Sequence, residues 1–66
     1  MLLYITFIIN ADDTWDEFDE YSYSEARTRA AQAKKAGAKF IAIRAKRDPF
    51  SDVSVQIYKY GQEDGE

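Results

Sequence analysis

The chain has 66 residues, of which 45% are hydrophobic and 15% aromatic, and its formal net charge is −3. A chain of this length forms one small domain with a thin stability margin and little room for a deep pocket. It contains neither cysteine nor histidine, which excludes disulfide bonds, thiolate catalysis, the usual nucleophile–base pairs and nearly all transition-metal sites. We therefore expect neither an enzyme of usual design nor a cofactor.

Charged residues are sorted along the chain into two blocks. Residues 12–25 contain seven acidic side chains and no basic one, whereas residues 27–47 contain eight basic side chains and no acidic one. A folded surface made from such blocks is expected to be electrostatically two-sided, which favours steering toward a charged macromolecule.

The first apolar segment, Leu2–Ile9, predicts a strand rich in β-branched and aromatic residues. Both of its faces are apolar, which is typical of a central strand. The segment lacks the positive leading region and cleavage site of a secretion signal and is too short to span a bilayer. We therefore expect an intracellular, cytoplasmic protein.

A second strand is predicted over Trp15–Tyr21, after a polar turn at residues 10–14. Its exposed side is heavily acidic, which suits a sheet edge because charge there blocks unwanted strand pairing. Phe18 breaks the strict alternation, so the pattern leaves the register of this strand open.

Helix signals follow at Ser22, where Ser22 and Glu25 fit a capping box, and the alanine-rich run continues to Ala36. Gly37 stands where a left-handed residue usually ends a helix. Residues at three- and four-residue spacings form one narrow face that lets the helix lie close against a sheet. This face consists of Tyr23, Ala26, Ala30, Ala33 and Gly37.

Two further strands are predicted over Lys39–Lys46 and Val53–Tyr60, joined by a turn at Asp48–Asp52. In the third strand, alternation places Ile41, Ile43 and Ala45 toward the core and Arg44 and Lys46 outward. In the fourth, it places Val53, Val55 and Ile57 inward and Ser54, Gln56, Tyr58 and Tyr60 outward.

The predicted fold class is α+β: an antiparallel four-stranded sheet with one helix packed on one face, in the order ββαββ. Residues 1–60 form the single domain, and residues 61–66 are expected to be an acidic, flexible tail.

Two charged clusters are candidate binding residues. The acidic cluster around residues 12–20 lacks the ligand spacing of a calcium loop, so we interpret it as solvated edge charge or part of a binding surface. The basic cluster comes from the helix and the third strand and either contacts phosphate or is simply solvated. The net negative charge weakens a general nucleic-acid role.

Aromatic residues form the third candidate set, expected on or near the sheet face away from the helix. An open face of this kind has three interpretations: a partner or dimer interface, plain exposure, or base stacking. The RNA-recognition consensus is absent. The expected aromatics are Tyr4, Trp15, Phe40, Tyr58 and Tyr60.

The stretch from Tyr21 to Ala45, with its Tyr-Ser-Tyr-Ser-Glu-Ala-Arg start and its Gly-Ala-Lys-Phe-Ile-Ala-Ile-Arg end, resembles a pattern in very small phage-encoded proteins. Some of those proteins are anti-CRISPR proteins or inhibitors of host RNA polymerase. The resemblance covers about a third of the chain and concerns topology. It implies a protein that acts by occupying a surface of a larger host complex, and it assigns no individual residue.

The leading hypothesis is a non-enzymatic binding module, a phage or mobile-element inhibitor that docks on a host protein or a ribonucleoprotein complex such as a CRISPR effector. The alternative is a small nucleic-acid-binding or regulatory domain, and a third is a structural homodimer formed through the open sheet face. No metal or membrane contact is expected. The predicted partner-binding residues are Arg27, Lys34, Arg44, Lys46, Arg47, Asp16, Glu17, Asp19, Glu20, Trp15, Tyr58 and Tyr60.

Overall fold

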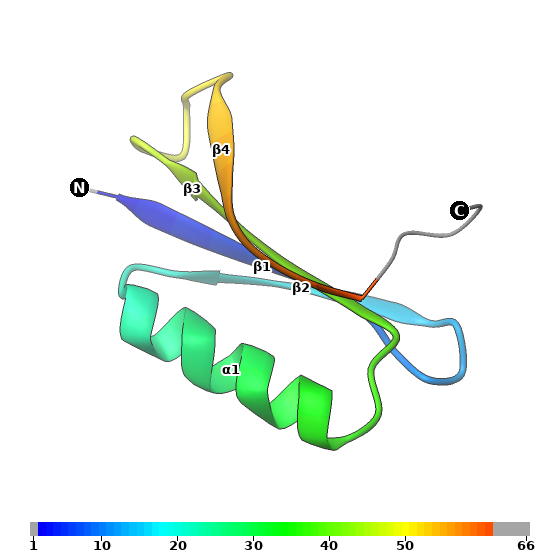
Figure 1. Ribbon diagram of the computed structural model, residues 1–66. Helices are drawn as coiled ribbons and strands as arrows, with labels where there is room; N and C mark the ends of the chain where they lie inside the picture. The colour runs from blue at the N-terminus through cyan, green and yellow to red at the C-terminus, as the bar shows by residue number, and fades with distance from the viewer. Residues whose placement is uncertain (1, 62–66) are drawn as a thin grey trace.

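The computed structural model, which describes residues 2–61, is one antiparallel four-stranded sheet with a single helix on one face (Figure 1). The sheet order is β2-β1-β3-β4, and the element order ββαββ confirms the predicted α+β class. The predicted tail at residues 61–66 begins inside a strand at Gly61, and residues 62–66 lie outside the described part. The elements are β1 (Leu3–Ile9), β2 (Trp15–Glu20), α1 (Tyr23–Lys35), β3 (Phe40–Lys46) and β4 (Ser54–Gly61).

β1 lies between β2 and β3, as its two apolar faces predicted, and β2 is an edge strand, as its acidity predicted. The turn between β1 and β2 is closed by Asp12, whose Oδ1 accepts hydrogen bonds from the Thr14 hydroxyl at 2.6 Å and the Thr14 backbone NH at 3.1 Å. These bonds stabilise the ionised form and hold the pKa of the Asp12 carboxyl below its ordinary value. Asp13 has a positive φ of 73°, which aspartate tolerates better than most residues.

The helix begins and ends where the sequence predicted. The Glu25 backbone NH donates to Ser22 Oγ at 3.4 Å, which satisfies one free donor of the first turn. The return bond from the Glu25 side chain, the other half of the predicted capping box, is not formed in the structure. Gly37 follows the helix with a φ of 94°, in the left-handed region where glycine carries no steric penalty.

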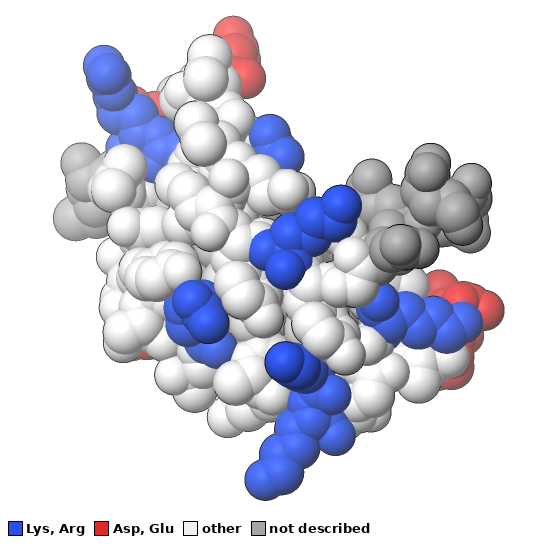
Figure 2. All heavy atoms as spheres, in the orientation of Figure 1, with Lys and Arg blue, Asp and Glu red and all other residues white. Residues whose placement is uncertain are grey.

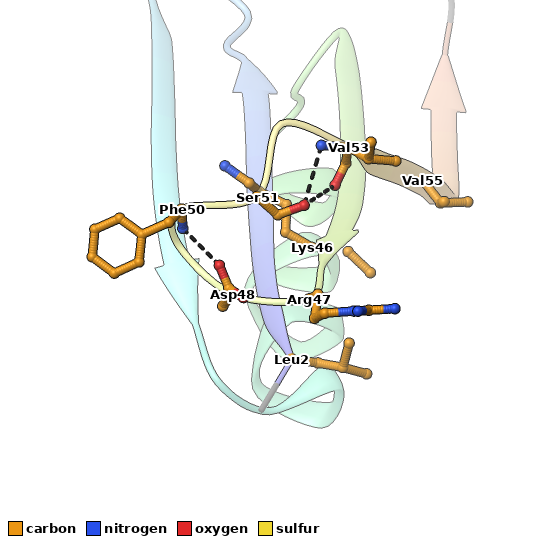
Figure 3. Close-up of a pocket in the computed structure, with 9 residues that line it drawn as sticks. Leu2, Lys46, Arg47, Asp48, Phe50, Ser51, Val53 and Val55 are labelled. Carbon is orange, nitrogen blue, oxygen red and sulfur yellow. Dashed lines mark hydrogen bonds between the residues drawn. The ribbon is translucent and has the colours of Figure 1, made fainter.

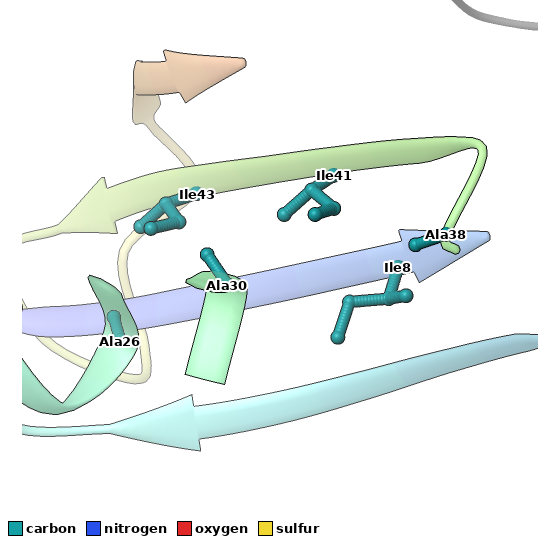
Figure 4. Close-up of a cluster of buried hydrophobic side chains, with 6 residues drawn as sticks. All are labelled: Ile8, Ala26, Ala30, Ala38, Ile41 and Ile43. Carbon is teal, nitrogen blue, oxygen red and sulfur yellow. The ribbon is translucent and has the colours of Figure 1, made fainter. Parts of the chain in front are cut away.

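The core is a thin layer between α1 and the two central strands. Ala26 and Ala30 point from α1 toward the strands that carry Ile8, Ile41 and Ile43, and all five side chains are buried (Figure 4). Small side chains on the helix let its backbone approach the sheet closely.

A bulge in β4 reverses part of the predicted inward and outward pattern. Ile43 pairs with Tyr58 but the next residue, Arg44, pairs with Gln56, so Ile57 has no partner in β3. Because the extra residue shifts the alternation by one, Tyr58 turns to the helix side, and so does Tyr60. The prediction that these two tyrosines face away from the helix is therefore wrong.

The residues predicted to point inward from β4 are largely exposed. Val55 does face the helix side, where it pairs with Ala45, yet 60% of it is accessible, and Val53 and Ile57 are exposed as well. The reason is that α1 lies over β1, β2 and β3 and its backbone does not reach β4 in the described part of the chain. β4 therefore lies beyond the part of the sheet that the helix covers.

Two glycines with positive φ provide a matched test of the close contact at the end of β4. A Cβ at Gly61 would lie 2.1 Å from the Lys39 carbonyl oxygen, whereas at Gly37 the nearest atom would be 3.9 Å away. Gly37→Ala should lower the free energy of unfolding by about 1–2 kcal/mol through backbone strain alone. Gly61→Ala adds the clash and should cost roughly 2–4 kcal/mol. Urea unfolding of both variants measures the difference; equal losses would contradict the close approach.

Candidate protein-binding surface

The sheet face opposite α1, here called the open face, has no element packed on it in the described part of the chain. Strand pairing assigns its residues, because directly opposite residues in an antiparallel pair point to the same side. Its members are Leu3, Ile5, Phe7, Ile9, Trp15, Glu17, Asp19, Phe40, Ala42, Arg44, Lys46, Ser54, Gln56, Lys59 and Gly61.

Charge is ordered across the open face from one edge to the other. One row of paired residues runs Glu17, Phe7, Ala42 and Lys59 from β2 to β4. The neighbouring row runs from Asp19 through Ile5 to Arg44 on β3 and ends at the neutral Gln56 on β4, so its basic residue lies one strand inside the edge. The open face therefore has an acidic edge, an apolar centre and a basic side.

Three aromatic rings border this apolar centre at one end. The Phe7 ring centroid lies 5.7 Å from that of Trp15 and 6.4 Å from that of Phe40. Phe40 is buried, whereas Trp15 is 63% exposed. Between the rings and the charged residues lies a shallow depression of about 280 Å³, whose lining includes Ile5, Phe7, Ala42 and Arg44.

Arg44 is held in place at the basic side of this depression. Its Nε donates to Ser54 Oγ at 2.8 Å and its Nη2 donates to the Ser54 carbonyl oxygen at 3.2 Å. Two bonds from one guanidinium restrict its side chain, so less freedom is lost when a ligand contacts it.

The turn between β3 and β4 rises on the side of the sheet opposite α1 (Figure 1) and carries exposed apolar groups. Phe50 is 92% exposed and points away from Leu2, Arg47 and Val55, which line a depression of about 780 Å³ (Figure 3). The turn is braced because the Phe50 NH donates to Asp48 Oδ1 at 2.9 Å. Phe50 is thus a large apolar side chain on a supported turn, without any internal packing role.

The helix side of the sheet places Arg27 and Lys34 over the β4 tyrosines. The Arg27 guanidinium lies 4.3 Å from the Tyr58 ring centroid, and the Lys34 ammonium lies 4.7 Å from that of Tyr60. Arg27 also donates to the Tyr23 hydroxyl, which raises the pKa of Arg27 above its ordinary value. Figure 2 shows basic side chains spread over the α1 and β4 side, with acidic groups only at its margins.

The predicted aromatic and basic contact residues are therefore divided between the two faces. Trp15 and Phe40 lie on the open face, whereas the half-buried Tyr4, Tyr58 and Tyr60 pack on the helix side. Their predicted position on the open face is wrong. Tyr4 belongs to the alternate residues of β1 that point toward the helix, and the bulge turns Tyr58 and Tyr60 to the same side.

The predicted basic residues are also divided between the two faces. Arg27 and Lys34 lie on the helix side, Arg44 and Lys46 on the open face, and Arg47 at the start of the rising turn.

The predicted acidic set is divided too. Glu17 and Asp19 lie on the open face, but Asp16 and Glu20 share the other side with Phe18. Glu20 is paired internally: its Oε2 accepts from Arg29 Nε at 2.7 Å, and its other oxygen is buried without a partner. Glu20 therefore stabilises the helix–sheet contact and is not free to bind a partner.

Several residues of the candidate surface were missed by the sequence analysis, chiefly the exposed Leu2 and Phe50, the half-buried Phe7, and the buried Ala42 that lines the depression. A signal did exist for Phe50, since a large apolar residue after Pro49 in a polar turn has no core to enter. Phe7 and Ala42 had no such signal, because alternation alone does not show which face of a central strand the helix leaves uncovered.

No protein-family model, curated protein or solved structure matches the chain. Within residues 2–61, no acidic side chains gather into a group that could hold a metal ion, and none of the helical structure is long and apolar enough to cross a bilayer.

The internal role of Glu20 gives a prediction. Arg29→Ala leaves a carboxylate with 11% exposure unpaired, so it should lower the free energy of unfolding by about 1–2 kcal/mol more than Arg27→Ala does. Arg27 is the matched control because it also covers an aromatic ring but forms no ion pair with a carboxylate within residues 2–61. Urea unfolding at neutral pH checks the order of the two losses, and the reverse order would show that Glu20 is solvated.

Proposed function

We propose that this chain is a non-enzymatic binding module that docks on a larger protein through its open face and the turn that rises beside it. The observation that supports this most strongly is the open face, on which no other element of residues 2–61 packs and whose apolar and aromatic centre lies between an acidic edge and a basic side. A sheet face of this composition gains free energy when another molecule covers it.

A single partner would cover a substantial part of a protein this small. A specific protein interface buries roughly 800 Å² on each side, which is about a sixth of the 4725 Å² accessible surface of the chain. Exposed aromatic side chains dominate the energy of many interfaces, and Trp15 and Phe50 are the exposed rings of the open face and the rising turn.

The partner follows from charge and from the resemblance of residues 21–45 to small phage-encoded inhibitors. We infer a host protein or a protein–nucleic acid complex, such as a CRISPR effector, one of whose working surfaces the module covers in the cytoplasm. Arg44, Lys46 and Arg47 on the basic side, with Glu17 and Asp19 on the acidic edge, would orient the encounter.

Substitution of Phe50 tests this proposal. After a pull-down from the natural host identifies the partner, Phe50→Ala should weaken its binding by about 2 kcal/mol, roughly thirtyfold, because a desolvated aromatic anchor is lost. The affinity of the purified pair is measured by calorimetry. Tyr21→Ala is the matched control, since Tyr21 is an exposed aromatic residue between β2 and α1 and should bind as the parent does. Equal affinity of the Phe50 variant and the parent would contradict the proposed surface.

A second candidate function, nucleic-acid binding, is favoured by one observation: the spread of basic side chains over the α1 and β4 side (Figure 2). On this hypothesis, fluorescence anisotropy with single-stranded RNA and DNA should show affinity that falls steeply with salt. Lys34→Glu should weaken that binding more than Lys46→Glu, because Lys46 lies on the open face. Absence of binding at low salt would eliminate this candidate.

A further inference from the structure

We propose that the open face receives a single amphipathic helix of the partner protein, with its apolar stripe over Phe7 and Ala42 and with charges of opposite sign along its two flanks. This inference rests on the proposed function and specifies what the partner must present. A helix in this position would complete a three-layer arrangement, with α1 on one side of the sheet and the partner helix on the other.

The distance between the charged residues on the two outer strands matches the diameter of a helix. Glu17 and Lys59 stand on the outer strands of one row, three strand spacings apart, which is about 14 Å. A helix with its side chains is about 10–12 Å in diameter, so one helix fits between the two charged edges. A second sheet would instead lay its own strands across the charges of β2 and β4.

The shape of the open face is also consistent with a docked helix. Ala42 is the smallest side chain of the row and lies between Phe7 and Lys59, while Phe40 and Trp15 stand at one end. The resulting depression of about 280 Å³ gives a large apolar side chain of the incoming helix a place to insert. An inserted side chain of this kind, surrounded by a charged rim, is the usual form of an interface anchor.

Charge complementarity then defines the flanks of the helix. Basic side chains belong next to Glu17 and Asp19, and acidic side chains belong next to Arg44 and Lys59. All four residues are exposed, so these pairs add little affinity and mainly select the orientation. Turning the helix by half a revolution about the normal of the sheet exchanges its flanks. Opposite charges on the two flanks therefore fix the direction in which the helix lies.

Synthetic peptides test the inference. Three helical peptides of roughly 20 residues share one leucine–alanine stripe and lack tryptophan. Their two flanks carry lysine on one side and glutamate on the other, lysine on both, or glutamate on both. Trp15 is the single tryptophan of the chain and stands beside the site, so its emission reports binding. The mixed peptide should bind roughly fivefold tighter than either uniform peptide at low salt.

Two charge-reversal variants make the test specific. Glu17→Lys with Asp19→Lys leaves the open face with basic edges only, so it should prefer the peptide with glutamate on both flanks. Arg44→Glu with Lys59→Glu should prefer the peptide with lysine on both flanks. Circular dichroism verifies that both variants fold. NMR chemical-shift changes of backbone amides that are confined to β1 and β3 when the peptide is added would confirm its position.

The remaining outcomes separate this inference from the proposed function. If the peptide preference does not change between the two variants, or if no peptide binds, the helix inference is overturned. The proposed function nevertheless stands if Phe50→Ala still weakens the natural partner. A dimeric mass in solution together with a buried Trp15 would show that a second copy covers the open face, and this too would overturn the inference.

Discussion

The close contact between the alanine face of α1 and the two central strands determines the rest of the structure. Ala26 and Ala30 are buried against Ile41 and Ile43, so the main core cluster lies in one layer, while Leu3, Phe40 and Ala42 are buried on the open face. Because the helix has only this narrow apolar face, it covers β1, β2 and β3 and leaves β4 beyond its reach. The core also contains one unsatisfied polar group, because the hydroxyl of Thr6 is buried there without a hydrogen-bond partner.

This contact also assigns different roles to the two groups of aromatic residues. On the helix side, the tyrosines of β4 extend past the helix and are covered by the long side chains of Arg27 and Lys34. Those rings are therefore partly covered within the molecule, whereas both cations stay exposed. On the open face, Phe40 is buried, whereas Phe7 is only half-buried and Trp15 is largely exposed, so Phe7 and Trp15 leave apolar surface for a partner.

Features encoded by neighbouring residues could be predicted from the sequence. Both helix ends follow from local signals, namely the Ser22 side chain at one end and the left-handed Gly37 at the other. The central position of β1 and the edge position of β2 follow from their composition. The face of Tyr58 and Tyr60 could not be predicted, because it depends on a bulge at Ile57 that arises from pairing with β3 and has no glycine to mark it.

The candidate surface was predictable only in part, for the same reason. Glu17, Asp19 and Arg44 were expected to bind, but which charges face one another across a sheet depends on strand register. Register also removed Glu20 from the surface, since it brings this carboxylate next to Arg29.

The two borders of the sheet differ in a way that limits self-assembly. Four of the six residues of β2 are acidic, so a second β2 is repelled, whereas β4 carries one charge, Lys59, among eight residues. A copy that pairs its own β4 with this β4 leaves an acidic β2 at both outer edges of the resulting dimer. Further addition through β2–β2 pairing is then opposed by repulsion between like charges.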